Sequence, residues 1–197
     1  MDGAAGVVEV ELDAPLDVAR WRPFFAWVPA IPHLVVLSVA GNVIWFVVLA
    51  AWLVALFTGR VPDGLAGAMA WYHRYTWRTL AYAAGLRGAP WPAFDVTFAT
   101  DDPGGDPARW VAPEPAEQGR ASIFFRWLLV LPAVFVFAFV AVAASVVWAV
   151  GSVVVVVTGA WPAGMREFLV GAARWGSRIN GYAYLLTDRY PPFTTGR

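Results

Sequence analysis

Two long stretches of the chain contain no charged side chain, and the second begins about 100 positions after the first. They run from Pro23 to Gly59 and from Trp127 to Met165. A helix needs about 20 apolar residues to cross the hydrocarbon layer of a membrane. The pattern therefore predicts a membrane helix at about 33–57 and another at about 133–157, and the repetition indicates one unit used twice.

The two halves align without a gap at a constant shift of 100 positions. Matching residues cluster where each apolar stretch begins, where it ends and in the segment that follows. Chance would not keep this register over the distance from Arg20 to Pro92. The matched pairs are Arg20/Arg120, Phe24/Phe124, Phe25/Phe125, Trp27/Trp127, Pro32/Pro132, Thr58/Thr158, Gly59/Gly159, Pro62/Pro162, Gly64/Gly164, Arg74/Arg174, Arg78/Arg178, Tyr82/Tyr182, Ala83/Ala183, Leu86/Leu186 and Pro92/Pro192.

A Thr-Gly pair followed by proline closes each apolar helix, because glycine adopts the left-handed conformation that ends a helix and proline cannot continue it. This structural motif consists of Thr58, Gly59 and Pro62 in the first half and Thr158, Gly159 and Pro162 in the second. A second, amphipathic helix is expected to follow in each half, at about 64–86 and 164–186. Two arginines four positions apart lie on one face of each.

The spacing of these elements predicts two repeats and a linker. The first repeat covers 1–94 and the second covers 120–197, while 95–119 is a polar linker rich in proline, glycine and acidic residues. Strand-forming residues at Val8–Leu12 and Val96–Phe98 predict minor short strands in the polar segments. The expected fold class is an all-α membrane protein in which each repeat pairs an apolar membrane helix with an arginine-bearing amphipathic helix.

Three topologies are compatible with the sequence. If the arginine-bearing helix lies flat on the membrane, each repeat crosses once and the two halves are inverted. If that helix crosses, its arginines sit near mid-depth at an insertion cost of about 2.5–3.5 kcal/mol each, which favours the flat arrangement. Pairing of the two strands would oppose the flat arrangement, because it requires an even number of crossings between them. A hairpin at Gly41-Asn42 ranks last, since the second repeat has Ala141-Val142 there.

Composition narrows the class of protein further. Hydrophobic residues make up 59% of the chain, above the roughly 45–50% of soluble domains. The net charge of zero gives no support for nucleic acid as a partner, and the absence of cysteine excludes disulfides and thiolate catalysis. Acidic residues precede the first basic one, Arg20, so no cleavable signal peptide is predicted.

Four arginines are the best candidates for a binding site. Guanidinium groups form paired hydrogen bonds with phosphate, so Arg74, Arg78, Arg174 and Arg178 could hold lipid headgroups or another anion. The competing interpretation is that they only anchor the helices at the membrane surface.

The other polar residues give less support for a functional site. His33 and His73 are expected to be polar side chains at headgroup level, and Asn42 to contribute a contact between helices. No nucleophile–base set, metal-ligand cluster or cofactor motif is visible, so no catalytic residue, metal or cofactor is predicted and the chain is not expected to be an enzyme.

Four strings carry a family resemblance: Ile31-Pro32-His33, Leu56-Phe57-Thr58-Gly59-Arg60-Val61-Pro62, Leu185-Leu186-Thr187-Asp188-Arg189-Tyr190-Pro191-Pro192-Phe193, and Arg174-Trp175 followed by Arg178, Asn180 and Tyr182. At these residues the chain resembles the DUF4389 family of bacterial membrane proteins. The similarity extends from about Arg20 to Phe193 as two copies of the family unit. Each copy departs somewhere: the first has Leu86-Arg87-Gly88-Ala89 in place of the Thr-Asp-Arg-Tyr string. The resemblance implies membrane location and the architecture of the unit, but no reaction.

These observations favour a non-catalytic component of the bacterial cytoplasmic (inner) membrane, multi-pass, that binds membrane lipids, other membrane proteins or a second copy of itself. The alternative is a subunit of a transporter or channel with a path between the repeats. A transport path usually carries polar groups at mid-depth, and the second apolar stretch offers only Ser145 and Ser152. An enzyme acting on lipids would need a carboxylate or histidine cluster that the sequence does not show.

Overall fold

The computed structural model describes residues 6–196 and is mostly helical. The first five residues of the predicted first repeat and Arg197 lie outside the described residues. In chain order the elements are β1 (Glu9–Leu12), α1 (Arg22–Phe25), α2 (Ile31–Thr58), α3 (Asp63–Ala83), β2 (Ala108–Val111), α4 (Arg120–Leu129), α5 (Leu131–Thr158) and α6 (Ala163–Ala183).

The two apolar stretches form single unbroken helices, α2 and α5, of 28 residues each. Each begins with proline in its first turn, where the missing amide hydrogen costs nothing. Each ends at a left-handed glycine, Gly59 with a φ of 80° and Gly159 with a φ of 85°. The Thr-Gly stop was therefore predicted correctly, and a hairpin at Gly41-Asn42 is wrong because α2 runs through it.

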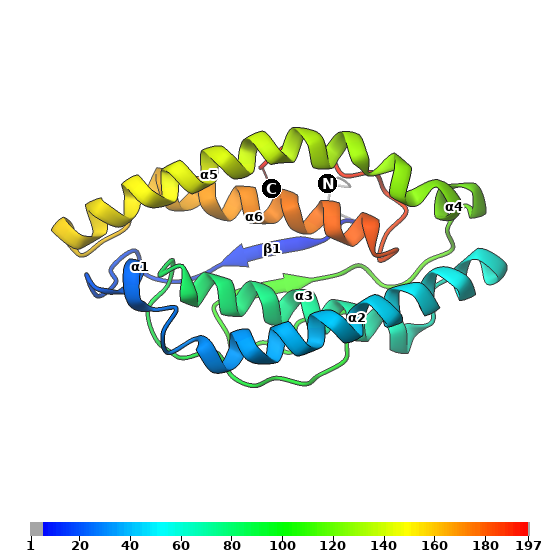
Figure 1. The fold of residues 1–197 in the computed structure, drawn as a ribbon, viewed down its shortest axis with the longest axis horizontal. Helices are drawn as coiled ribbons and strands as arrows, with labels where there is room; N and C mark the ends of the chain where they lie inside the picture. Colours follow the sequence, from blue (N-terminus) through cyan, green and yellow to red (C-terminus); the bar gives the residue numbers. More distant parts are fainter. Residues whose placement is uncertain (1–5, 197) are drawn as a thin grey trace.

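The arginine-bearing helices α3 and α6 fold back along α2 and α5, as the many contacts of each pair show (Figure 1). Both are largely buried, whereas the outer helices bury only a narrow stripe such as Ile44, Val48 and Ala51. Because α3 lies alongside α2, the two must share one orientation relative to any membrane. A crossing α2 combined with a flat α3, the combination that the sequence favoured, is wrong.

A two-stranded antiparallel sheet joins the halves. Its register pairs Val10 with Trp110, residues separated by the repeat shift of 100, so the pseudo-two-fold axis passes between them. The predicted N-terminal strand is confirmed. The second strand is misplaced in the sequence prediction, because β2 lies at Ala108–Val111 inside the linker while Val96–Phe98 is extended without strand pairing.

The elements are arranged symmetrically around this sheet (Figure 1): α6 packs on β1, α3 packs on β2, and α5 and α2 lie outermost. The entry helices are exchanged between halves. Helix α1 of the first half contacts α5, and α4 of the second half contacts α2. The exchange makes the two units interdependent.

Candidate functional site

Arg74 lies on the inner face of α3 and is completely buried. Its guanidinium group donates to the carbonyl oxygens of Ala99 and Asp101 at 3.0 Å each, and to that of Thr97. Its Nε lies 3.5 Å from a carboxylate oxygen of Asp95. Arg74 thus satisfies backbone acceptors of an extended segment that has no strand partner.

Arg78, one turn further along α3, binds two carboxylates of the linker. Its nitrogens lie 3.1 Å from Asp95 and 2.6 Å from Asp102, whose side chain is fully buried. Asp102 also accepts a hydrogen bond from the backbone of Trp110 in β2, at 3.0 Å. Arg78 therefore fastens the linker, and through it the sheet, onto α3.

Asp95 is held in its charged form. Burial raises the pKa of its carboxyl, but hydrogen bonds from Thr97 and the guanidinium groups of Arg74 and Arg78 outweigh that effect and leave the pKa below its ordinary value. The first arginine pair is thus a neutralised internal cluster.

The second arginine pair holds the C-terminal segment and β1 in the same manner. Arg174 donates to the carbonyls of Val10 at 3.1 Å and Thr195 at 2.9 Å, and Arg178 donates to Gly196 at 3.0 Å. At the position matching Asp95, the second half has Thr195. Carbonyl oxygens take over the role of the carboxylates, with Glu167 3.7 Å from Arg174.

The structure does not bring the four candidate arginines into one site. Arg74 and Arg78 face β2 and the linker, while Arg174 and Arg178 face β1 and the C-terminal segment. Each of the four guanidinium groups donates to partners within the chain. The geometry therefore favours anchoring over headgroup or anion binding for these residues.

The Thr-Gly motif has a second role beyond ending a helix. The Gly59 carbonyl accepts a hydrogen bond from the Gln118 amide at 2.8 Å, and the Gly159 carbonyl accepts one from the Val18 amide at 2.9 Å. The motif of each half thus receives the segment that enters the other half. The hydroxyl of Thr58 donates back to the carbonyl of Val54 at 2.9 Å, which secures the last turn of α2.

A family model described as a domain of unknown function, DUF4389, matches residues 20–93 and 120–195. These two matches cover most of the chain. The chain belongs to the DUF4389 family. No curated protein and no solved structure shows detectable similarity to it. Both strands lie outside the matched residues, so the DUF4389 unit consists of the entry segment, the helical hairpin and the extended tail.

The two DUF4389 units use arginine differently at the entry helix, which sequence reasoning missed. Arg126 is fully buried in the second unit, where it donates to Asp188 at 2.8 Å and to Gln118 at 2.7 Å, and its guanidinium lies 4.1 Å from the ring centroid of Tyr182. At the positions matching Arg126 and Asp188, the first unit has Ala26 and Gly88. Arg22, one turn before Ala26, lies over the ring of Tyr82 instead. The ion pair of Arg126 and Asp188 could have been predicted from the positions at which the two repeats differ.

Both histidines are buried rather than interfacial. His33 hydrogen-bonds Tyr75 through Nδ1 and stacks on Phe94, with ring centroids 4.2 Å apart. His73 lies against Trp110 near the pseudo-two-fold axis, and burial lowers its pKa to about 4. Asn42 is exposed and donates to the carbonyl of Ser38 within α2 at 2.6 Å. Within residues 6–196, no three His, Asp or Glu side chains gather as a metal site requires.

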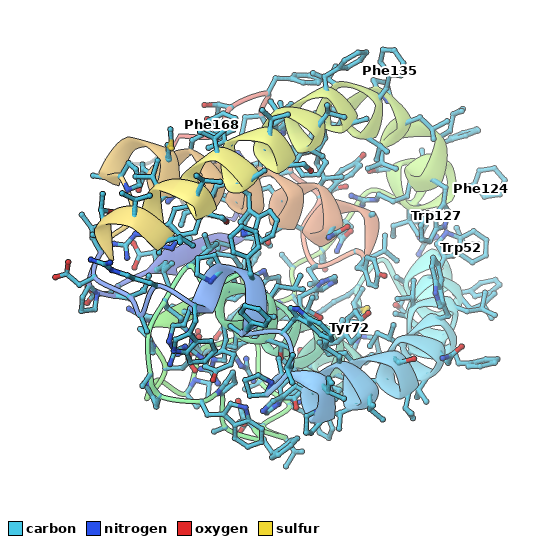
Figure 2. The ribbon with its side chains drawn as sticks, turned by 60° about the vertical axis from the view of Figure 1, so that its left-hand side comes forward. Trp52, Tyr72, Phe124, Trp127, Phe135 and Phe168 are labelled. Carbon is cyan, nitrogen blue, oxygen red and sulfur yellow. The ribbon has the colours of Figure 1, made fainter. Side chains whose placement is uncertain are left out.

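An open apolar groove of about 450 Å³ lies where α2 meets α4. Its lining contains no charged residue and consists of Trp45, Phe46, Val48, Leu49, Trp52 and Trp127. Figure 2 shows Trp52 and Trp127 next to each other at this junction. Trp52 is fixed by a hydrogen bond from its indole nitrogen to the Ile123 carbonyl at 3.0 Å, so the groove is a built feature of the contact between DUF4389 units.

Proposed function

We propose that this DUF4389 protein is a non-catalytic component of the bacterial cytoplasmic membrane that binds lipid through its outer helices. One observation carries the proposal: the surfaces of α2 and α5 that face away from the protein are uncharged along their whole length and mainly apolar. Two of their exposed polar side chains in mid-helix, Asn42 and Ser145, donate to carbonyl oxygens of their own helix. Large apolar residues are strongly exposed on them, among them Phe57 at 75%, Phe46 at 74% and Phe135 at 68%. A helix on the surface of a soluble protein presents polar residues on that side.

The size of this surface supports the same conclusion. Soluble monomers rarely expose contiguous apolar patches beyond a few hundred Å². Two helical segments, Ile31–Thr58 and Arg120–Thr158, are long and apolar enough to span a membrane, and little of either is buried within the protein. A lipid environment removes the penalty of exposing these side chains to water.

The entry helices support contact with lipid headgroups. Exposed aromatic residues such as Trp21 and Phe25 on one side, and Phe124 and Phe125 on the other, are side chains that favour the membrane interface. The exposed arginines Arg20 and Arg120 begin the two family units beside them. Headgroup contacts are therefore assigned to these residues rather than to the buried arginine pairs.

The apolar groove supports binding of an acyl chain. Its walls offer rings and aliphatic carbons, and its volume lies within the range of small-molecule sites. A transport role has less support, because the pseudo-two-fold axis between the units passes between Val10 and Trp110, which are 1% exposed. An enzyme has less support because the arginine pairs of α3 and α6 engage structural partners.

The first experiment tests membrane attachment. Full-length protein in a bacterial host should sediment with membranes, resist washing with carbonate at high pH and dissolve only in detergent. Recovery of monodisperse protein from the aqueous fraction would overturn the proposal.

The second experiment tests the groove. Native mass spectrometry of detergent-purified protein titrated with phospholipid should show several-fold less bound lipid for W45A/W127A than for the wild type. Phe139→Ala removes an exposed ring from α5, away from the groove, and should change lipid binding little. Equal binding by all three proteins would contradict the assignment of the groove.

A further inference from the structure

The charged side chains of the sheet define one face of the molecule. Glu9 and Glu11 of β1 and Arg109 of β2 are exposed, while the residues that alternate with them, Val10 and Trp110, are buried. Successive side chains of a strand point to opposite faces. The sheet therefore has one charged, exposed face and one apolar, covered face.

The apolar face of the sheet points toward the long helices. Val10 and Trp110 belong to the same buried cluster as Ile44 and Val48 of α2 and Ile123 of α4. On the other half, Leu12 of β1 packs on a buried cluster that contains Val155 of α5, and Trp148 of α5 packs on the same cluster. The exposed apolar helices and the charged sheet face consequently lie on opposite sides of the molecule.

A membrane-spanning orientation conflicts with the position of the sheet. The sheet lies at the centre of the long axis, and the α2–α3 and α5–α6 turns lie at opposite ends of it (Figure 1). If α2 and α5 crossed the bilayer, the exposed Glu9, Glu11 and Arg109 would sit near its midplane. A charge at that depth is costly unless it is paired or shielded, and Glu9, Glu11 and Arg109 are all exposed.

The length of the helices agrees with a different orientation. Each has 28 residues and so measures about 42 Å, against about 30 Å of hydrocarbon. Neither helix has a polar face of its own, so each can sink fully into the acyl layer. The sheet and the polar linker supply the polar side that the helices lack.

We propose that the protein occupies a single leaflet, with α2 and α5 lying along the membrane plane and the charged sheet face in water. This inference rests on the proposed membrane attachment and replaces the multi-pass arrangement that the sequence suggested. A lipid leaflet is the partner that fits the long outer helices, because both are uncharged from end to end and expose mainly large apolar side chains.

The chain contains no cysteine, so single cysteines report accessibility without background. Gly64 and Gly164 are equivalent residues at the two hairpin turns, and a side chain added at either meets nothing within 4 Å. We would label Gly64→Cys, Gly164→Cys and Glu11→Cys in intact spheroplasts and in inverted vesicles with a membrane-impermeant maleimide. Val142→Cys, on the exposed surface of α5, is the lipid-facing control.

The single-leaflet arrangement predicts that all three polar-side positions react from the same side, each at least tenfold more than from the other. Labelling of Gly64→Cys and Gly164→Cys from opposite sides would overturn it, as would a Glu11→Cys that reacts only after detergent is added. Failure of membrane attachment itself gives a different result: carbonate releases the chain. If Val142→Cys then stays protected in a released dimer, a second copy covers the face instead of lipid.

Discussion

At the scale of single residues, the arginines of α3 are committed to the protein's own backbone and carboxylates. A buried ion pair gives little net stability compared with an apolar pair, but removal of one partner leaves a charge without compensation. Arg78 is the sharpest case, because it neutralises Asp102, whose side chain has no contact with solvent.

Arg78→Met should therefore lower the free energy of unfolding in detergent by about 3–5 kcal/mol. Adding Asp102→Asn should recover about 1–2 kcal/mol of that loss, because the stranded charge is gone. Arg60→Met breaks an exposed pair with Asp63 and should change stability by less than about 1 kcal/mol. Thermal unfolding in detergent measures all three. Equal effects of Arg78→Met and Arg60→Met would contradict the buried-clamp interpretation.

His73 provides a pH dependence with a defined sign. Burial lowers its pKa from 6.5 to about 4, so the folded state favours the neutral ring. The contribution of His73 to the free energy of unfolding is fully present above pH 6.5. It is lost as the pH falls through the folded-state pKa of about 4, by roughly 3 kcal/mol in total. The carboxyl of Asp95 has its own lowered pKa and loses its contribution only at lower pH.

Unfolding of wild type and His73→Phe should therefore be compared between pH 7 and pH 4. Phenylalanine keeps a ring against Trp110 and removes the titrating group. The variant should lose less stability over this interval than the wild type. Parallel pH profiles for the two proteins would show that protonation of His73 does not limit stability.

At the scale of elements, the sequence predicted the helices well and the second strand poorly. The predicted helices at 33–57 and 64–86 correspond to α2 (Ile31–Thr58) and α3 (Asp63–Ala83), because uncharged runs and Gly-Pro stops act locally. The second strand depends on pairing with β1. Extending the shift of 100 back to Glu9–Leu12 would have pointed to 109–112.

The candidate site was predictable only in part. The spacing of Arg74 and Arg78 placed them on one helical face, as found. Their partners, Asp95 and Asp102, lie in an irregular linker whose path no local pattern describes. For that reason the arginines looked available for lipid when the fold in fact uses them.

Helix packing in the two units differs by compensating sizes. In the second unit Gly151 of α5 faces the ring of Trp161, which a side chain at 151 would overlap. In the first unit the equivalent residues are Ala51 and Val61. A glycine that faces a tryptophan in the second unit thus corresponds to an alanine and a valine in the first unit.

Gly151→Ala should cost about 1–3 kcal/mol through overpacking. Combined with Trp161→Val, which recreates the pair of the first unit, it should cost less than the sum of the two single changes by about 1 kcal/mol or more. Gly164→Ala, at an open position of α6, should cost nothing. Thermal unfolding in detergent measures these losses. If the loss of stability in the double variant equals the sum of the two single losses, Gly151 and Trp161 do not compete for space.

At the scale of the whole molecule, each half is completed by the other. Helix α1 packs on α5 and α4 packs on α2. Trp161 donates a hydrogen bond to the Gly85 carbonyl at 2.7 Å across the same boundary. Part of the packing of each unit is therefore supplied by its neighbour.

A chain split between the exposed glycines Gly104 and Gly105 should consequently reassemble. Each fragment, 1–104 or 105–197, keeps one strand and one family unit, and co-expression should recover both through a tag on either one. Expressed alone, each fragment should aggregate or pair with itself, because its entry helix and strand lack their partners. Replacing Trp161 by alanine should weaken recovery of the pair, whereas Phe139→Ala, on the exposed surface of α5, should not. If either fragment purified alone as a folded monomer, the exchanged contacts would be dispensable for folding.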